Sequence, residues 1–170
     1  MSGCDAARIA KVSGGYILSG QAVFSDPNGP AALRYRLDLA PDWSTLAGRI
    51  DGFIGSRAIG SCVVRTERGW SLNGRDFPMA EVRDLDLGFT PATNMPQLRR
   101  VALEVGQDKS FDVAWLDAGS DELVPLPQNY KRISDRAYDY QSSTLGYEAT
   151  IVLAESGFAS DYPRLWKLEE

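Results

Sequence analysis

Alternation of apolar and polar residues dominates this chain, and it limits the available folds more than any other feature of the sequence. Between residues 16 and 24 the apolar side chains share one parity and polar residues take the other. After the turn-forming run 26–30 the same pattern resumes from 33 to 39. Side chains of a strand point alternately to its two faces, so the pattern predicts an antiparallel hairpin with one apolar face.

Further strand-like segments follow at short intervals. We expect them at 46–54, 59–66, 70–73, 82–89, 101–105, 111–117, 130–134, 137–143, 147–154 and 158–168. Gly48 and Gly52 predict a bulge or a bend in the first of these, and prolines interrupt the stretch 123–128. Many short strands at intervals of about 8 to 12 residues indicate an antiparallel meander that forms a sandwich, a barrel or a strongly curved sheet.

One segment, from Asn94 to Ala102, favours a helix. Thr93 or Asn94 can cap its first turn, and Pro96 suits an early helical position. So short a helix is unstable alone in water, and it must therefore pack against the sheet. The chain has 170 residues and no internal repeat, so we expect residues 1–170 to form a single, mainly β domain.

Composition excludes several classes of function. Histidine is absent, which removes the usual triad base and imidazole zinc ligands, and we expect no catalytic residue, metal or cofactor. The net charge of -5 argues against nucleic acid as a partner. Two cysteines, Cys4 and Cys62, are too few for a disulfide framework and fit a cytoplasmic protein.

The sequence also bears on membranes and on the N-terminus. No apolar run is long enough to span a bilayer, so we expect no stable membrane insertion. Residues 1–4 resemble the end of a lipoprotein signal but lack its apolar segment, and we expect them to fray.

Asp84 and Asp86 are the first candidate functional residues. In the run Asp84-Leu85-Asp86-Leu87, strand geometry places both carboxylates on one face, about 7 Å apart, and both leucines on the other. Such a pair could bind sugar hydroxyls or a cation, or act as acid and base in glycoside cleavage. Spacing alone favours a plainer interpretation, namely the solvated outer face of a sheet whose leucines point inward.

Arginines and tyrosines supply the other candidates. Arg99 and Arg100 point about 100° apart on a helix, so only one of them can reach back to the aspartates or to an anionic headgroup. The alternative is a surface ion pair. Tyr130, Tyr138 and Tyr140 lie among polar residues, where their rings could stack on sugars or fill the core of a sheet.

The run Asp-Leu-Asp-Leu-Gly-Phe-Thr-Pro-Ala-Thr-Asn at 84–94, followed by Leu98-Arg99-Arg100, resembles the glycolipid-binding family of bacteria, long classed as a domain of unknown function. Segments 70–74, 130–140 and 157–166 resemble the family in the same order. The family commonly reads Thr-Asn-x-Leu-Pro-Ile-Arg-Arg, and this chain has its proline one position earlier.

This resemblance implies a many-stranded, curved antiparallel sheet, open and barrel-like, wrapped around one short α-helix. It also implies a homodimer, a remote similarity to lipoprotein localisation factors, and an acidic pocket for glycolipid or sugar groups. Ligand-binding candidates carried over by matching positions, with the tyrosines added for their chemistry, are Asp84, Asp86, Thr93, Asn94, Arg99, Arg100, Tyr130, Tyr138 and Tyr140.

Three functions remain open. The preferred one is non-catalytic binding of a glycolipid or sugar-containing small molecule, with acyl chains in an apolar trough and Asp84 and Asp86 on the sugar, in glycolipid or cell-envelope metabolism. The first alternative is a glycoside or glycolipid hydrolase that uses the two carboxylates as acid and base. The second is a structural dimer without a small ligand, whose aromatic residues form the subunit interface.

Overall fold

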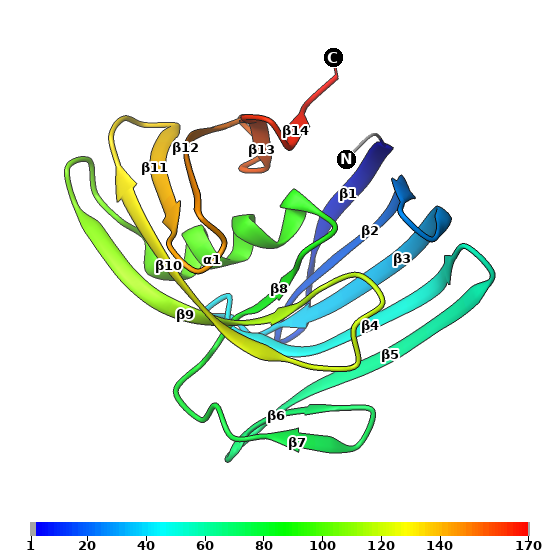
Figure 1. Ribbon diagram of the computed structural model, residues 1–170. Helices are drawn as coiled ribbons and strands as arrows, with labels where there is room; N and C mark the ends of the chain where they lie inside the picture. The colour runs from blue at the N-terminus through cyan, green and yellow to red at the C-terminus, as the bar shows by residue number, and fades with distance from the viewer. Residues whose placement is uncertain (1–2, 170) are drawn as a thin grey trace.

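The computed structural model describes residues 3–169, and its strands form two curved sheets with one α-helix between them (Figure 1). The first sheet comes from the N-terminal half of the chain and the second from the C-terminal half. The expected mainly β architecture, curved around a single short helix, is confirmed. The strands divide into two sheets of seven, and the chain passes from one to the other just before the helix.

The first sheet is an antiparallel meander in chain order. Its strands are β1 (Gly3–Val12), β2 (Gly15–Asp26), β3 (Gly29–Leu39), β4 (Thr45–Ile54), β5 (Arg57–Thr66), β6 (Gly69–Leu72) and β7 (Arg75–Phe77). The hairpin expected around residues 26–30 is confirmed, since β2 pairs with β3 from Tyr16 opposite Leu39 to Asp26 opposite Gly29. The alternation places every second side chain of β3 in the core.

The second sheet contains one parallel pair. Its strands are β8 (Leu85–Leu87), β9 (Asp108–Leu116), β10 (Val124–Arg132), β11 (Ala137–Ser142), β12 (Tyr147–Leu153), β13 (Ala159–Tyr162) and β14 (Trp166–Lys167). The strands β9 to β14 pair antiparallel with their neighbours, whereas β8 pairs with β9 in parallel. The prediction of an antiparallel meander is wrong at β8. The helical connection after β8 carries the chain back to the end of the sheet where β8 began, so β9 runs parallel to β8.

Two strand predictions around the helix are wrong. The strand expected at 82–89 shortens to the three residues of β8. The segment 101–105 forms no strand, because the helix continues to Val101 and Ala102 then takes a left-handed conformation with φ 48°. The sequence pattern also fails to predict β1, whose alanine-rich residues do not alternate clearly. Gly3 and Cys4 belong to β1 and are not frayed, while Met1 and Ser2 lie outside the described residues.

In β10 and β4, prolines and glycines do not have the effects that the sequence predicts. Pro125 and Pro127 do not interrupt β10, because that part of the strand pairs with β9 on one edge and with no strand of the described residues on the other. The bulge in β4 occurs at Leu46, since Asp38 pairs with Ala47 and Leu39 pairs with Thr45. It is therefore displaced from the two glycines.

The helical connection consists of a short 3₁₀ helix η1 (Pro91–Thr93) and α1 (Asn94–Val101). The helix occurs where the sequence predicts it, but its cap differs. Thr90 caps η1 by accepting a hydrogen bond from the backbone N–H of Ala92, whereas Thr93 caps nothing with its side chain. The Thr93 hydroxyl instead donates a hydrogen bond to the buried carboxylate of Asp86.

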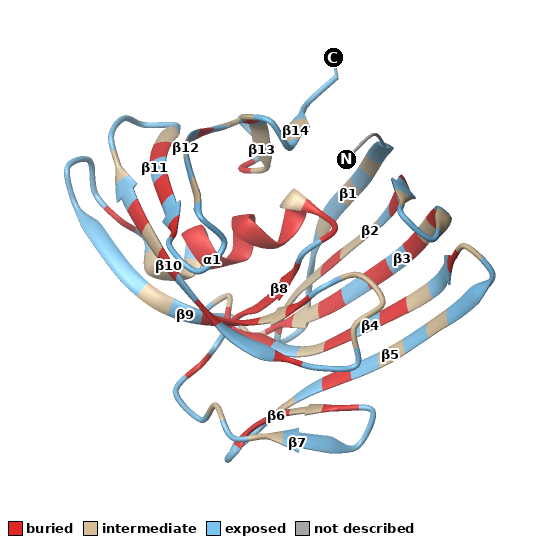
Figure 2. Ribbon diagram, in the orientation of Figure 1, coloured by how far each residue is buried: buried red, intermediate tan, exposed pale blue. Residues whose placement is uncertain are grey.

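The core has two parts, one on each side of α1 and β8. Figure 2 shows α1 largely buried and the strands of the first sheet alternating between buried and exposed residues. Leu85 and Leu87 join the cluster of the first sheet, while Leu98 joins the tyrosine-rich cluster of the second sheet. Within residues 3–169 no helix has both the length and the hydropathy needed to cross a membrane.

Candidate functional site

Asp84 forms a buried ion pair with Arg100. The Arg100 Nε lies 2.9 Å from Oδ1 of Asp84, and Nη2 lies 2.6 Å from Oδ2. The Asp84 side chain is 1% exposed and that of Arg100 is 17% exposed. Burial raises the pKa of the Asp84 carboxyl, while the hydrogen bonds and charge of Arg100 oppose this rise. One arginine thus reaches back to the aspartates, and it is Arg100.

Asp86 is buried among neutral hydrogen-bond donors. Thr93 Oγ1 donates to Oδ1 at 2.6 Å, and Gln128 Nε2 donates to Oδ2 at 2.7 Å. Burial raises the pKa of the Asp86 carboxyl, and these hydrogen bonds only partly oppose the rise. Unlike Asp84, this carboxylate forms no ion pair with any of the described residues.

Asn94 and Tyr130 extend the same network across the second sheet. Asn94 Nδ2 donates to the Tyr130 hydroxyl at 2.6 Å, and that hydroxyl donates to Gln97 Oε1 at 3.4 Å. Tyr140 packs against Tyr130 with ring centroids 4.8 Å apart. Burial raises the pKa of Tyr130 well above the usual range, so the phenol is a neutral hydrogen-bonding group. Seven of the candidate residues therefore gather between α1 and the second sheet. Asp84 pairs with Arg100, while Asp86, Thr93, Asn94 and Tyr130 share a buried hydrogen-bonded network through Gln97, and Tyr140 packs against it.

The location of the acidic pair corrects the sequence interpretation. Asp84 and Asp86 do not lie on a solvated outer face, because they are 1% and 8% exposed and their side of β8 is covered by α1 and by the second sheet. Donor groups already occupy both carboxylates, which gives neither of them room to transfer a proton to a sugar. Their geometry fixes the position of α1, and it does not favour the hydrolase alternative.

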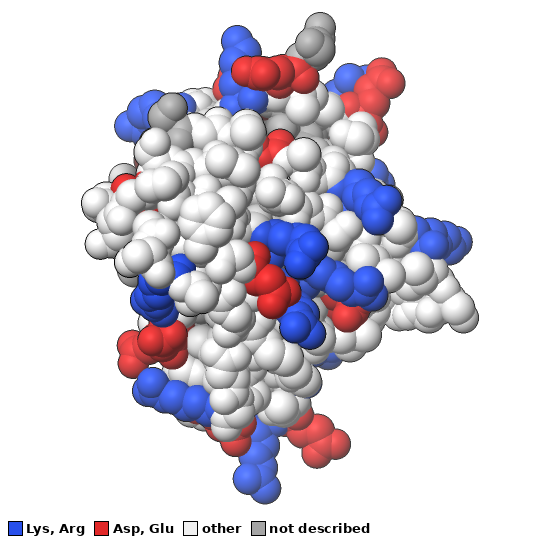
Figure 3. All heavy atoms as spheres, turned by 90° about the vertical axis from the view of Figure 1, so that its right-hand side faces the viewer, with Lys and Arg blue, Asp and Glu red and all other residues white. Residues whose placement is uncertain are grey.

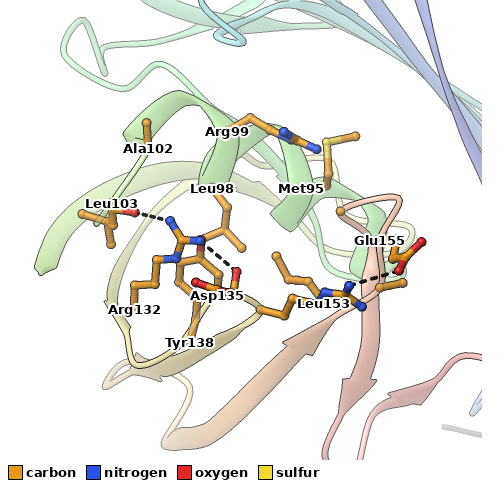
Figure 4. A pocket seen from close by; sticks show the side chains of 13 residues that line it. Met95, Leu98, Arg99, Ala102, Leu103, Arg132, Asp135, Tyr138, Leu153 and Glu155 are labelled. Carbon is orange, nitrogen blue, oxygen red and sulfur yellow. Dashed lines mark hydrogen bonds and ion pairs between the residues drawn. The ribbon is translucent and has the colours of Figure 1, made fainter. Parts of the chain in front are cut away.

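Tyr138 and Arg99, the two remaining candidates, line a pocket between α1 and the end of the second sheet (Figure 4). The pocket has a volume of about 460 Å³. Its lining comes from α1 and the residues after it, from the β10–β11 turn and from the β12–β13 loop. The lining residues are Met95, Leu98, Arg99, Ala102, Leu103, Arg132, Asp135, Arg136, Tyr138, Leu153, Ala154, Glu155 and Gly157.

Arg132 is held rigidly in this pocket. Its guanidinium donates to the backbone oxygens of Leu103, Ser134 and Asp135 at 2.8, 3.1 and 2.8 Å. It also lies over the Tyr138 ring, 5.7 Å from the centroid. The sequence does not single out Arg132 as a site residue, although Arg132 stands within a segment that resembles the family. Its contact with Leu103 links residues 29 positions apart, which no local pattern predicts.

The other polar groups of the pocket are more exposed. Arg136 forms an ion pair with Glu155 at 3.1 Å, and both side chains are exposed. Arg99 extends along the rim, 5.9 Å from the Trp43 ring centroid, and no carboxylate of the described residues lies within 4 Å of it. Three arginines and two carboxylates line the pocket, so it is not the acidic pocket that we expect from the resemblance. The physical reason is that Asp84 and Asp86 face the interior.

The described residues contain no group of three or more histidine, cysteine, aspartate or glutamate side chains placed to hold a metal ion. The pocket offers arginine and carboxylate hydrogen-bonding groups at its rim and apolar side chains at its walls. This arrangement suits a ligand with a polar end and an apolar end.

Comparison with protein families matches residues 1–167 to the family described as "Putative glycolipid-binding". The chain belongs to this family. Among solved structures it is similar to a DUF1089 family protein of Pseudomonas aeruginosa, with 23% sequence identity and a TM-score of 0.86. That match covers 99% of this chain and 93% of the other, and at this identity it shows the fold alone. A search of curated proteins found no match.

Proposed function

We propose that the protein binds a glycolipid without transforming it, in the pocket of Figure 4. The observation that carries the proposal is that apolar walls and fixed polar groups meet in one hollow of suitable size for a small ligand. Membership of the family supports the class of ligand. The protein would act in glycolipid or cell-envelope metabolism by holding such a molecule.

The pocket divides into two regions with different roles. Leu98, Leu103 and Leu153 provide an apolar wall for the alkyl part of the ligand. Arg99 and Glu155 stand at the rim, where their charged groups can bond sugar hydroxyls strongly. Tyr138 and Arg132 form the polar end of the wall, because the guanidinium covers the ring.

The buried candidate residues position the helix and do not contact the ligand themselves. Asp84 and Asp86 anchor α1 through Arg100 and Thr93. Asn94 and Tyr130 fix the same helix to β10. This anchoring sets the direction of Leu98 and Arg99, so we assign the network to positioning and not to direct contact with the sugar.

Binding of n-dodecyl-β-maltoside below its critical micelle concentration tests this function. Calorimetry should show saturable binding of this alkyl glycoside, and much weaker binding of maltose or of dodecylphosphocholine, which lack one half of the ligand. Leu153→Asp should weaken binding by about tenfold or more, because a buried apolar contact is lost. Val152→Asp is the matched control, since the neighbouring side chain points to the other face of β12.

Two results would overturn the proposal. The first is equal binding of all three probes, which would show that sugar and chain are not recognised together. The second is unchanged affinity in the Leu153→Asp protein, which would place the ligand elsewhere.

We further propose a homodimer formed through β1. This ten-residue strand pairs with β2 along one edge, and its opposite edge pairs with no strand of the described residues. A long, alanine-rich edge is a template for pairing with another strand. The aromatic interface of the structural-dimer alternative is not favoured, because Tyr138 and Tyr140 are buried within the chain itself.

A cytoplasmic location is also part of the proposal. Cys4 and Cys62 are both free and exposed. Exposed thiols persist in a reducing compartment, where disulfides are rare.

A further inference from the structure

Four arginines gather on the outer face of the first sheet, the face turned away from α1. The strand register aligns Arg8, Arg36 and Arg49 in one row, with Ser19 between the first two. Arg34 lies on the same face in the next row, opposite Asp51. Neighbouring strands are about 4.8 Å apart, so the row of three arginines spans about 14 Å.

The pairing of Arg36 with Arg49 is unusual for a sheet. The two residues stand directly opposite each other on adjacent antiparallel strands, where like charges are destabilising. Asp38 binds Arg36 at 2.8 Å and Asp51 binds Arg49 at 3.0 Å, both from the same strand as their arginine. These aspartates neutralise two of the four charges on this face.

The other two arginines have no acidic partner among the described residues. Arg8 donates a hydrogen bond to the Ser19 hydroxyl at 3.3 Å, and no carboxylate within the described part of the chain lies within 4 Å of Arg8 or Arg34. Across β1 to β4 this face therefore carries four arginines and two aspartates, a net charge of +2, on a chain of net charge -5. One further aspartate of the same face, Asp76, stands on β7 in the row of Val64. Excess positive charge is thus concentrated on this face, whereas the rest of the molecule is acidic.

This face is hollowed and has an apolar margin. All four arginines line a shallow hollow of about 710 Å³, together with Ser19, Gln21 and apolar residues of β1 and β2. Exposed apolar side chains of the same parity flank it, namely Val23, Phe53 and Val64. Figure 3 shows one side of the molecule, where a few groups of basic and acidic side chains stand among broad uncharged areas.

We propose that this face docks on a membrane that contains anionic lipid, with lipid phosphates in the arginine hollow. Charge complementarity selects this occupant, because guanidinium groups bind phosphate oxygens and the cytoplasmic leaflet is anionic. A symmetric second copy on the same face would bring one arginine row against another. The apolar margin rests against the interface between headgroups and acyl chains. This docking face shares no residue with the ligand pocket, so it is independent of the proposed function.

Co-sedimentation of the full chain with lipid vesicles tests the proposal. We expect binding to vesicles of phosphatidylcholine mixed with phosphatidylglycerol, little binding to pure phosphatidylcholine, and loss of binding at high salt. The double variant Arg8→Gln/Arg34→Gln should weaken the vesicle partition coefficient about 25-fold, since each surface arginine contributes about fivefold. Neither change leaves an aspartate without its partner.

The matched control is Arg57→Gln/Arg75→Gln. It removes the same number of positive charges from exposed ion pairs elsewhere in the first sheet, so its net charge equals that of the test variant. We expect it to partition like the parent. An environment-sensitive dye on Cys62, in a Cys4→Ser background, provides a second readout, because Cys62 lies opposite Arg49 on the docking face.

Three results would overturn the proposal. Equal partition of the test variant and the parent would show that the arginines do not bind the vesicle. Binding of inorganic phosphate in the absence of any vesicle binding would show a site for a free anion. Self-association that is lost in the test variant, again without vesicle binding, would show an interface between two copies.

Discussion

At the scale of single residues, two aspartates separated by one leucine have different electrostatic states. Asp84 is neutralised by Arg100, whereas Asp86 is held by the hydroxyl of Thr93 and the amide of Gln128. Gln128 Oε1 has no hydrogen-bond partner among the described residues. A hydrogen-bond donor at position 86 could satisfy that oxygen after rotation of the amide, which an ionised carboxylate cannot do.

Asp86→Asn should therefore stabilise the protein at neutral pH by about 1 kcal/mol. The pKa of Asp86 is raised in the folded state, so the folded protein binds the proton more tightly than the unfolded chain. The cost of the buried charge is present above the raised pKa, and it is relieved as the pH falls toward the ordinary carboxyl range near about 3.9. Thermal unfolding at several pH values should show the advantage of the variant shrinking on acidification; a pH-independent loss of stability would contradict this.

Asp84→Asn should have the opposite effect. It leaves the Arg100 guanidinium, 17% exposed, without its counterion, which should cost about 3 kcal/mol. Urea unfolding measures the loss, and the double variant Asp84→Asn/Arg100→Gln should lose less than the sum of its single changes. Full additivity would mean that the two side chains do not interact.

At the scale of elements, α1 determines how the site is built. Its position between the sheets turns one face of the helix, with Met95, Leu98 and Arg99, toward the pocket. On another side, Thr93 just before the helix bonds to β8 and Asn94 bonds to β10. The parallel pairing of β8 with β9 follows from this helical connection. The helix ends at Val101, and the residue that caps its C-terminus, Ala102, has a φ of 48° in the left-handed region.

Ala102→Gly should stabilise the protein by about 1 kcal/mol, because glycine avoids the cost of a Cβ in the left-handed conformation. Thermal or urea unfolding provides the measurement. Ala6→Gly in the extended strand β1 is the control, and it should destabilise by about 0.5 to 1 kcal/mol. A loss of stability at position 102 similar to that at position 6 would contradict the argument.

At the scale of the whole molecule, the proposed homodimer depends on the edge of β1 that pairs with no strand of the described residues. Adjacent residues of an edge strand direct their N–H groups to opposite sides, so one of Ile9 and Ala10 presents its N–H to the free edge. Proline at the residue whose N–H faces the free edge removes a hydrogen-bond donor that a second copy would need. Proline at the other of these two residues removes a hydrogen bond to β2.

Comparison of Ile9→Pro with Ala10→Pro therefore tests the homodimer. Light scattering over a range of concentrations should show a dimer for the parent and a monomer for the variant that blocks the free edge, with melting close to that of the parent. The other variant should lose thermal stability. A parent that is monomeric at every concentration would rule out this interface.

The sequence by itself determined the strands with clear alternation, the hairpin at 26–30 and the place of α1, because these depend on local periodicity and turn residues. It also identified residues that the fold brings together, since Asp84 pairs with Arg100 and since Asp86, Thr93, Asn94 and Tyr130 share one hydrogen-bonded network. It did not determine that this network is buried. The period of a strand distinguishes its two faces but does not say whether a second layer covers the polar one.

Only the tertiary structure decided which candidate residues line a hollow and which charges stand together. Arg132 reaches the carbonyl of Leu103, and the hydroxyl of Thr90 reaches Asp5 across 85 residues of chain. The arginine row arises because three separate strands align in register. Such contacts depend on the packing of two sheets around one helix, and packing of distant segments leaves no periodic signal in the chain itself.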